Sequence, residues 1–96
     1  MNGVYRIFVT AAADRVFKKL PRRMREEIER ELRILSTNPY AGERLSEPLG
    51  FLYSYHFTVF GKYFRAAYAV EGRKRTVTLH YVGPRGEFYK RLRRLF

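Results

Sequence analysis

Three consecutive β-prone segments fill much of the second half of the chain and limit what it can fold into. The segments cover residues 51–60, 63–71 and 75–82. Short glycine-containing turns separate them, at Gly61-Lys62 and at 72–74. Alternating apolar and polar residues joined by turns this short are typical of antiparallel hairpins. The pattern therefore predicts a three-stranded meander that stops at Gly83-Pro84, because proline cannot donate to a sheet ladder.

The first half of the chain predicts one short strand followed by two helices. Val4 to Val9 is β-prone, and Thr10 is a good N-cap for a helix that begins at Ala11. Pro21 then suits the first turn of a second helix, which Asn38-Pro39 ends. Apolar residues recur at helical spacing in both helices: Ala13, Val16, Phe17, Leu20, Met24, Ile28, Leu32 and Leu35. The two helices should form a hairpin with one apolar face.

Alternation along the meander assigns its residues to two faces of a sheet. One face collects bulky apolar side chains, including Val77, Leu79 and Tyr81, and should pack against the helical hairpin. The other face carries polar groups around small alanines: Ser54, His56, Arg65, Ala67, Ala69, Thr78 and His80. Small residues inside a basic ring predict a shallow concavity that is open to a single-stranded polyanion.

The segment after the meander combines arginine, glycine and aromatic residues. Arg85 follows the last strand, and Tyr89 lies about one helical turn further on. Between Glu87 and Phe96, apolar residues at helical spacing alternate with basic ones. The apolar residues are Phe88, Leu92 and Leu95. This pattern predicts a short basic amphipathic helix, or a tail that a partner orders.

The charge balance is strongly basic. Twenty Lys and Arg against nine Asp and Glu give a net charge of +11, which predicts a polyanionic partner, either nucleic acid or an acidic protein. The chain has no Cys, and no His, Asp and Glu spacing indicates a metal site. It shows no apolar run of about 18 residues and no signal peptide. We therefore expect residues 1–96 to form a single cytoplasmic domain with no membrane partner.

Five pieces of the sequence occur in a fixed order: a β-strand, a helical hairpin that closes on Asn38-Pro39, Arg44-Leu45 in a loop, GKYFRAAYAV and LHYVGPRGEFYKRL. In this order and spacing they resemble the RelE/ParE toxins of type II toxin–antitoxin systems. The resemblance covers about Val4 to Leu92, and the PRGEFYK ending is most similar to the archaeal RelE branch. It implies an α+β fold: a small, twisted, mainly antiparallel sheet of about four strands, backed by the N-terminal helical hairpin, with a short C-terminal helix.

The resemblance also implies an activity. RelE-type toxins cut mRNA in the ribosomal A site without a metal or other cofactor. Arg65 and Arg85 would hold the scissile phosphate and its developing charge while the RNA 2′-hydroxyl attacks, and Tyr89 would stack on a base or move a proton. Further RNA contacts are expected from Arg44, Ser54, Lys62, His80, Lys90 and Arg91.

The chain departs from the RelE pattern at the general base. Some RelE proteins carry two lysines where this chain has Ser54 and His56, and others carry a histidine where it has Pro84. His56 can take the role of base, because the ordinary pKa of histidine lies near neutrality. Alternatively, the site works by electrostatic stabilisation and positioning alone.

Two other functions stay open. A ParE-like toxin would inhibit DNA gyrase and cut nothing. A nucleic-acid-binding module without toxicity would expect exposed aromatic residues on the polar face for base stacking, and the sequence places almost none there. Either kind of toxin implies an acidic antitoxin that covers the helical hairpin or displaces the tail from Glu87 to Phe96. The nuclease also implies the ribosome and mRNA as partners.

Overall fold

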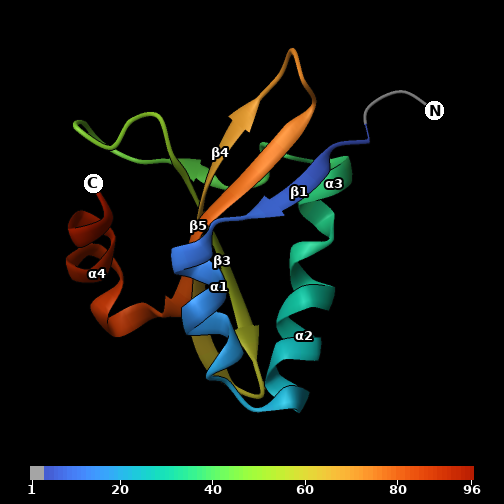
Figure 1. Cartoon of the computed structure of the whole chain (residues 1–96), viewed down its shortest axis with the longest axis vertical. Coiled ribbons are helices and arrows are strands. Elements are labelled where there is room, and N and C mark those ends of the chain that lie inside the picture. Colours follow the sequence, from blue (N-terminus) through green and yellow to red (C-terminus); the bar gives the residue numbers. More distant parts are fainter. Residues whose placement is uncertain (1–3) are drawn as a thin grey trace.

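A mixed sheet lies at the centre of the molecule. Its strands are β1 (Arg6–Val9), β2 (Glu43–Arg44), β3 (Tyr53–Val59), β4 (Lys62–Glu71) and β5 (Thr76–Pro84). The helices are α1 (Ala11–Lys18), α2 (Arg22–Leu32), α3 (Ile34–Thr37) and α4 (Phe88–Leu95), with a 3-10 helix at Arg85–Glu87. The computed structural model describes residues 4–96, and Figure 1 shows α1 and α2 side by side, with α4 apart from them.

The strand order is β1-β5-β4-β3-β2, with β1 parallel to β5 and the other pairs antiparallel. The predicted α+β fold is confirmed, with five strands in place of about four. The additional strand is β2, where Glu43 pairs with Ser54 and Arg44 with Tyr53. A strand of two residues is too short to show any alternation, so the sequence pattern around it is that of a loop.

One side of the sheet, called here the first face, packs against α1 and α2. The Thr10 hydroxyl accepts a hydrogen bond of 3.1 Å from the Ala13 amide, which confirms the predicted cap of α1. The core on this face joins α2 and α3 to the three long strands. Its largest fully buried side chains are Tyr68, Ile28, Leu35 and Val77. The helical hairpin is thus anchored by the apolar residues that the helical spacing identified.

Two details of the meander differ from prediction. The turn between β3 and β4 is at Phe60-Gly61, where both residues have positive φ, of 50° and 78°, as a type I′ hairpin turn requires. Strand β5 does not stop before Gly83-Pro84 but includes both residues, which pair with Arg65 and Phe64. Pro84 is tolerated because it is the last residue of the strand, where the ladder needs no further donor.

A β-bulge at His80 changes which face the end of β5 presents. Ala67 pairs with Tyr81 and Tyr68 pairs with Leu79, so His80 is an extra residue on β5. The prediction that Tyr81 shares a face with Val77 and Leu79 is therefore wrong. Tyr81 lies on the opposite side of the sheet, called here the second face, and Val82 replaces it in the core of the first face.

The second face carries its own smaller core and is not the open concavity that alternation predicted. The side chains of this second core come from the loop before β3, from β4 and β5, and from α4: Leu49, Leu52, Ala67, Tyr81, Phe88 and Leu92. The bulge supplies Tyr81, and α4 supplies the cover. The predicted amphipathic helix is confirmed. In the part of the chain that the structure describes, no helix is long and apolar enough to cross a membrane.

Candidate functional site

A basic groove opens on the second face beyond the end of the second core. It consists of two adjoining depressions, with volumes of about 420 and 640 Å³, that share Tyr63, Arg65 and Arg85. Other residues that line the groove, called here the arginine groove, include His56, Thr58, Lys62 and Tyr89. Strands β3 and β4, the end of β5 and the start of α4 all contribute to it.

Arg65 occupies the centre of the arginine groove. It pairs with His56 on β3 and with Gly83 on β5, so two strands fix its backbone. Its guanidinium lies 5.4 Å from the Phe88 ring centroid and 5.5 Å from that of Tyr89. Cation–π contacts of this kind hold an arginine in place without neutralising it. The first turn of α4 therefore orients Arg65.

Arg85 approaches the same groove from the end of β5. Its guanidinium lies 6.0 Å from the ring centroid of Tyr63. Among residues 4–96, none of the ion pairs involves Arg65 or Arg85. The two guanidiniums thus present unpaired donors to one space, which suits an anion with several oxygens, such as a phosphate.

Sequence reasoning missed Tyr63. Its side chain is 65% exposed, and it lines both depressions of the arginine groove. A large aromatic side chain beside Arg85 gives the groove a surface for a base. The sequence could have identified Tyr63, because it is two residues before Arg65 and so projects from the same face of β4.

His56 lies across from Arg65 at the rim of the arginine groove. Partial burial lowers the pKa of His56, and the charges of Arg65 and Arg85 lower it further, while Glu43 acts in the opposite direction. The imidazole is therefore neutral at pH 7. A neutral, accessible imidazole beside two arginines is able to accept a proton from a bound hydroxyl group.

Of the six residues expected to make further RNA contacts, Lys62 lines the arginine groove. Ser54 does not, because it is 2% exposed, so the structure does not place it on an open polar face as predicted. Arg44 lies in β2, where its Nε donates a 2.6 Å hydrogen bond to the Gly50 carbonyl. Both residues therefore stand outside the groove.

The other three expected RNA contacts lie around α4. The His80 ring is 5.2 Å from the ring of Phe96, centroid to centroid, and burial lowers the pKa of His80. Arg91 pairs with Glu87 at 3.1 Å, and Lys90 is exposed. The arginine groove thus unites Arg65, Arg85, Tyr89, His56 and Lys62, while His80 faces a different part of the second face.

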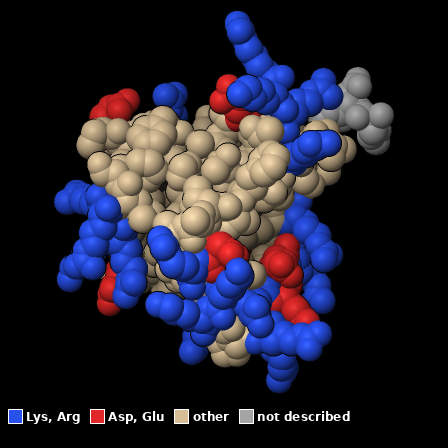
Figure 2. All heavy atoms as spheres, viewed as in Figure 1, with Lys and Arg blue, Asp and Glu red and all other residues tan. Residues whose placement is uncertain are grey.

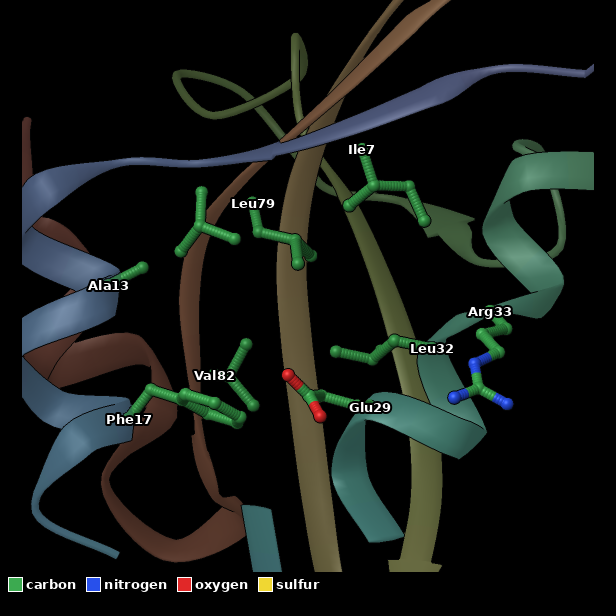
Figure 3. Close-up of a pocket in the computed structure, with 9 residues that line it drawn as sticks. Ile7, Ala13, Phe17, Glu29, Leu32, Arg33, Leu79 and Val82 are labelled. Carbon is green, nitrogen blue, oxygen red and sulfur yellow. The ribbon is translucent and has the colours of Figure 1, made fainter. Parts of the chain in front are cut away.

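A separate apolar pocket of about 350 Å³ lies on the first face, between α1 and α2. Figure 3 shows Phe17, Leu32, Leu79 and Val82 around it, with the Glu29 carboxylate at the α2 side. In Figure 2 a broad uncharged area is flanked by Lys and Arg side chains.

Across residues 4–96 no group of three or more His, Cys, Asp or Glu is arranged to hold a metal ion.

Comparison with known proteins gives a family match over nearly the whole chain. Residues 7–93 match the model of a family described as ParE-like toxin of type II bacterial toxin-antitoxin system. No curated protein matches the chain.

Several solved structures share the fold. The RelBE2 toxin–antitoxin complex from Mycobacterium tuberculosis matches at 24% identity and a TM-score of 0.72, over 88% of this chain and 95% of that one. A mutant of the E. coli toxin RelE in the free state matches at 21% identity and 0.71, over 97% and 99%. The archaeal RelE–RelB complex from Pyrococcus horikoshii matches at 19% and 0.62, over 86% and 97%. Because the identities are below 25%, these matches establish a shared fold and nothing beyond it.

Proposed function

The chain belongs to the ParE-like toxin family of type II bacterial toxin–antitoxin systems, and from this premise we propose that it is a cytoplasmic toxin that cuts mRNA. The proposed activity is that of a metal-independent, ribosome-dependent endoribonuclease that acts in the ribosomal A site and stops translation. The observation that carries the proposal is the convergence of Arg65, Arg85, His56 and Tyr89 on one groove.

In the proposed reaction the RNA supplies its own nucleophile. The 2′-hydroxyl oxygen attacks the adjacent phosphorus in line, and the bond from phosphorus to the 5′ oxygen breaks. The products are a 2′,3′-cyclic phosphate and a 5′-hydroxyl group. Arg65 and Arg85 hold the phosphate and stabilise the charge that grows on its oxygens. One hydrogen-bond donor of this kind raises a reaction rate by about 10²- to 10³-fold.

His56 and Tyr89 have complementary roles in this proposal. His56 takes the proton of the attacking 2′-hydroxyl, because its lowered pKa leaves the imidazole neutral at pH 7. Tyr89 is half exposed and lies over Arg65, where it stacks on a base next to the scissile phosphate or supplies a proton to the leaving oxygen. Lys62 adds positive charge at the rim of the arginine groove.

The alternative is ParE-like inhibition of DNA gyrase without cleavage of RNA. The matched family is described as ParE-like, which favours it. The two strand positions where some RelE proteins carry lysines also favour it, because Ser54 is buried and His56 is the single titratable group left there.

We also propose an acidic antitoxin as partner, since the similar structures from M. tuberculosis and P. horikoshii are toxin–antitoxin complexes. An acidic chain would offset the net charge of +11. The apolar pocket between α1 and α2 offers it a place on the helical hairpin (Figure 3). If deletion of residues 90–96 leaves antitoxin affinity unchanged, this tail takes no part in antitoxin binding.

The deciding experiment is induced expression in cells, followed by primer extension on abundant mRNAs. Wild type is compared with Arg85→Ala and with Arg73→Ala, which removes the same charge in the β4–β5 turn. We expect cuts within codons for wild type and Arg73→Ala and none for Arg85→Ala. Growth arrest with intact mRNA and a DNA-damage response would instead establish the gyrase alternative.

A further inference from the structure

A second groove adjoins the arginine groove, and Tyr89 lines both. One wall of this second groove, called here the aromatic groove, is the loop from Leu45 to Phe51, and the other is α4. Its volume is about 750 Å³. A ligand bound at Arg65 therefore reaches the aromatic groove by passing Tyr89.

The α4 wall presents a regular row of side chains. Tyr89 and Arg93 in α4, and Phe96 directly after it, are spaced at i, i+4 and i+7, so they follow one side of the helix. The row is about 10 Å long, the length of roughly three nucleotides in a stacked strand. Phe88 and Leu92, on another side of the helix, are buried in the second core and hold the wall in place.

The aromatic side chains that line the aromatic groove are about half exposed. Tyr89, Phe51 and Phe96 are 49%, 50% and 55% exposed. Phe51 and Phe96 meet edge to face, with ring centroids 5.2 Å apart. Aromatic faces beside a positively charged track are the usual means by which proteins bind single-stranded nucleic acid.

The charged groups of the aromatic groove fit the same ligand. Within the described residues, neither Arg93 nor Glu47 belongs to an ion pair. Arg93 can therefore meet a phosphate, and the Glu47 carboxylate can accept a hydrogen bond from an exocyclic amino group of a base. A purely apolar protein segment would leave both charges without partners.

We propose that the aromatic groove binds the bases of the nucleotides that flank the scissile phosphate in single-stranded RNA. Phe51 and Phe96 stack on the bases, Arg93 holds the backbone, and Tyr89 divides the base-binding part from the phosphate-binding part. The inference rests on the proposed nuclease function and adds a determinant of where the RNA is cut.

The test uses an oligoribonucleotide of six residues with 2′-O-methyl groups, which cannot be cut, and measures binding by fluorescence anisotropy. Wild type is compared with the double variant Phe51→Ala/Phe96→Ala. The control is Phe60→Ala, since Phe60 is 56% exposed but lies in the β3–β4 turn. We expect affinity to fall at least about tenfold in the double variant and to stay unchanged in the control. Circular dichroism confirms that each variant is folded.

A second set of oligonucleotides, each with one abasic position, identifies the bases that the groove holds. At one or more positions, loss of the base should weaken binding to wild type but not to the double variant. Equal weakening of both proteins at every position, or no binding of wild type at all, overturns the proposal. So does a double variant that binds RNA normally but loses antitoxin affinity, because the groove then serves a protein partner. The primer-extension comparison with Arg85→Ala tests the nuclease separately.

Discussion

The two faces of the sheet are covered to different extents, although the same strands form both. On the first face, α1 and α2 lie over a core that runs from Tyr68 to Phe64 and on to Val59. On the second face, the core of α4 and the loop before β3 extends along β4 only as far as Ala67. The next residue on that side of β4 is Arg65, which lines the arginine groove.

This difference explains where the arginine groove lies. Phe64 and Ala66 are buried on the first face, while Arg65 between them points to the second. A strand with one face fully packed is held rigidly, and its other face is free to carry reactive groups. The arginine groove is thus the uncovered end of the second face, and behind it Phe64 and Ala66 are packed in the core of the first face.

The largest expected effects come from substitutions in the two cores, which should differ in their effect on cleavage. Leu35→Ala in the first core and Leu92→Ala in the second should each lower the free energy of unfolding by about 2–5 kcal/mol, because both side chains are fully buried. At temperatures where both variants stay folded, only Leu92→Ala should also slow cleavage, because α4 carries Phe88 and Tyr89 against Arg65. Urea unfolding and cleavage rates measure the two quantities. Equal cleavage in both variants would show that α4 does not support Arg65.

The next largest effect on cleavage should come from substitution of Arg65, at the open end of the second face. Arg65→Ala should slow cleavage about 10²- to 10³-fold, while Arg73→Ala, in an exposed turn, should leave it unchanged. Arg65→Lys should not restore the rate, because lysine lacks the planar fork that binds two phosphate oxygens. Full activity of Arg65→Lys would show that charge alone suffices at this position.

A smaller effect tests the base. His56→Gln should slow cleavage about 10²-fold, the low end of what a general base contributes. For wild type, the rate should be level above about pH 6.5 and fall below it, through the lowered pKa of His56. In His56→Gln that acidic decline should disappear. A decline that persists in the variant would assign it to another group and favour catalysis by positioning and charge.

The smallest effect concerns acid stability. The chain has two histidines, and both lie on the second face, with pKa values lowered mainly by burial. Below about pH 6.5 the unfolded chain therefore binds more protons than the folded one. The contribution of the two histidines to stability is complete above about pH 6.5, and it is lost as the pH falls through their lowered folded-state pKa values. His80→Gln should therefore lose less stability than wild type between about pH 7.5 and pH 5 in urea unfolding. An identical loss in the two proteins would leave His80 without a part in acid sensitivity.

The first face could be predicted from the sequence in far more detail than the second. Strict alternation through Phe57 and Phe64, together with helical spacing at Ile28 and Leu35, identifies its core. On the second face, one extra residue at His80 moves Tyr81 across the sheet. Nothing in the sequence marks a bulge here, because the residues alternate on both sides of it. Arg65, Arg85 and Tyr89 could be named from the resemblance. The burial of Ser54 could not be predicted, because alternation alone places this residue on a polar face.

The parallel pairing of β1 with β5 has a consequence for the order in which the protein is made. Residues 6–9 pair with residues 76–79, so β1 cannot join the sheet until residue 79 has been synthesised. Contacts this distant in sequence are formed late and slowly. Arg65 then acquires its aromatic support only when Phe88 and Tyr89 have been added. We therefore expect the proposed nuclease site to stay incomplete until the ribosome has translated past Tyr89, so that up to that point the nascent chain does not attack the ribosome that is making it.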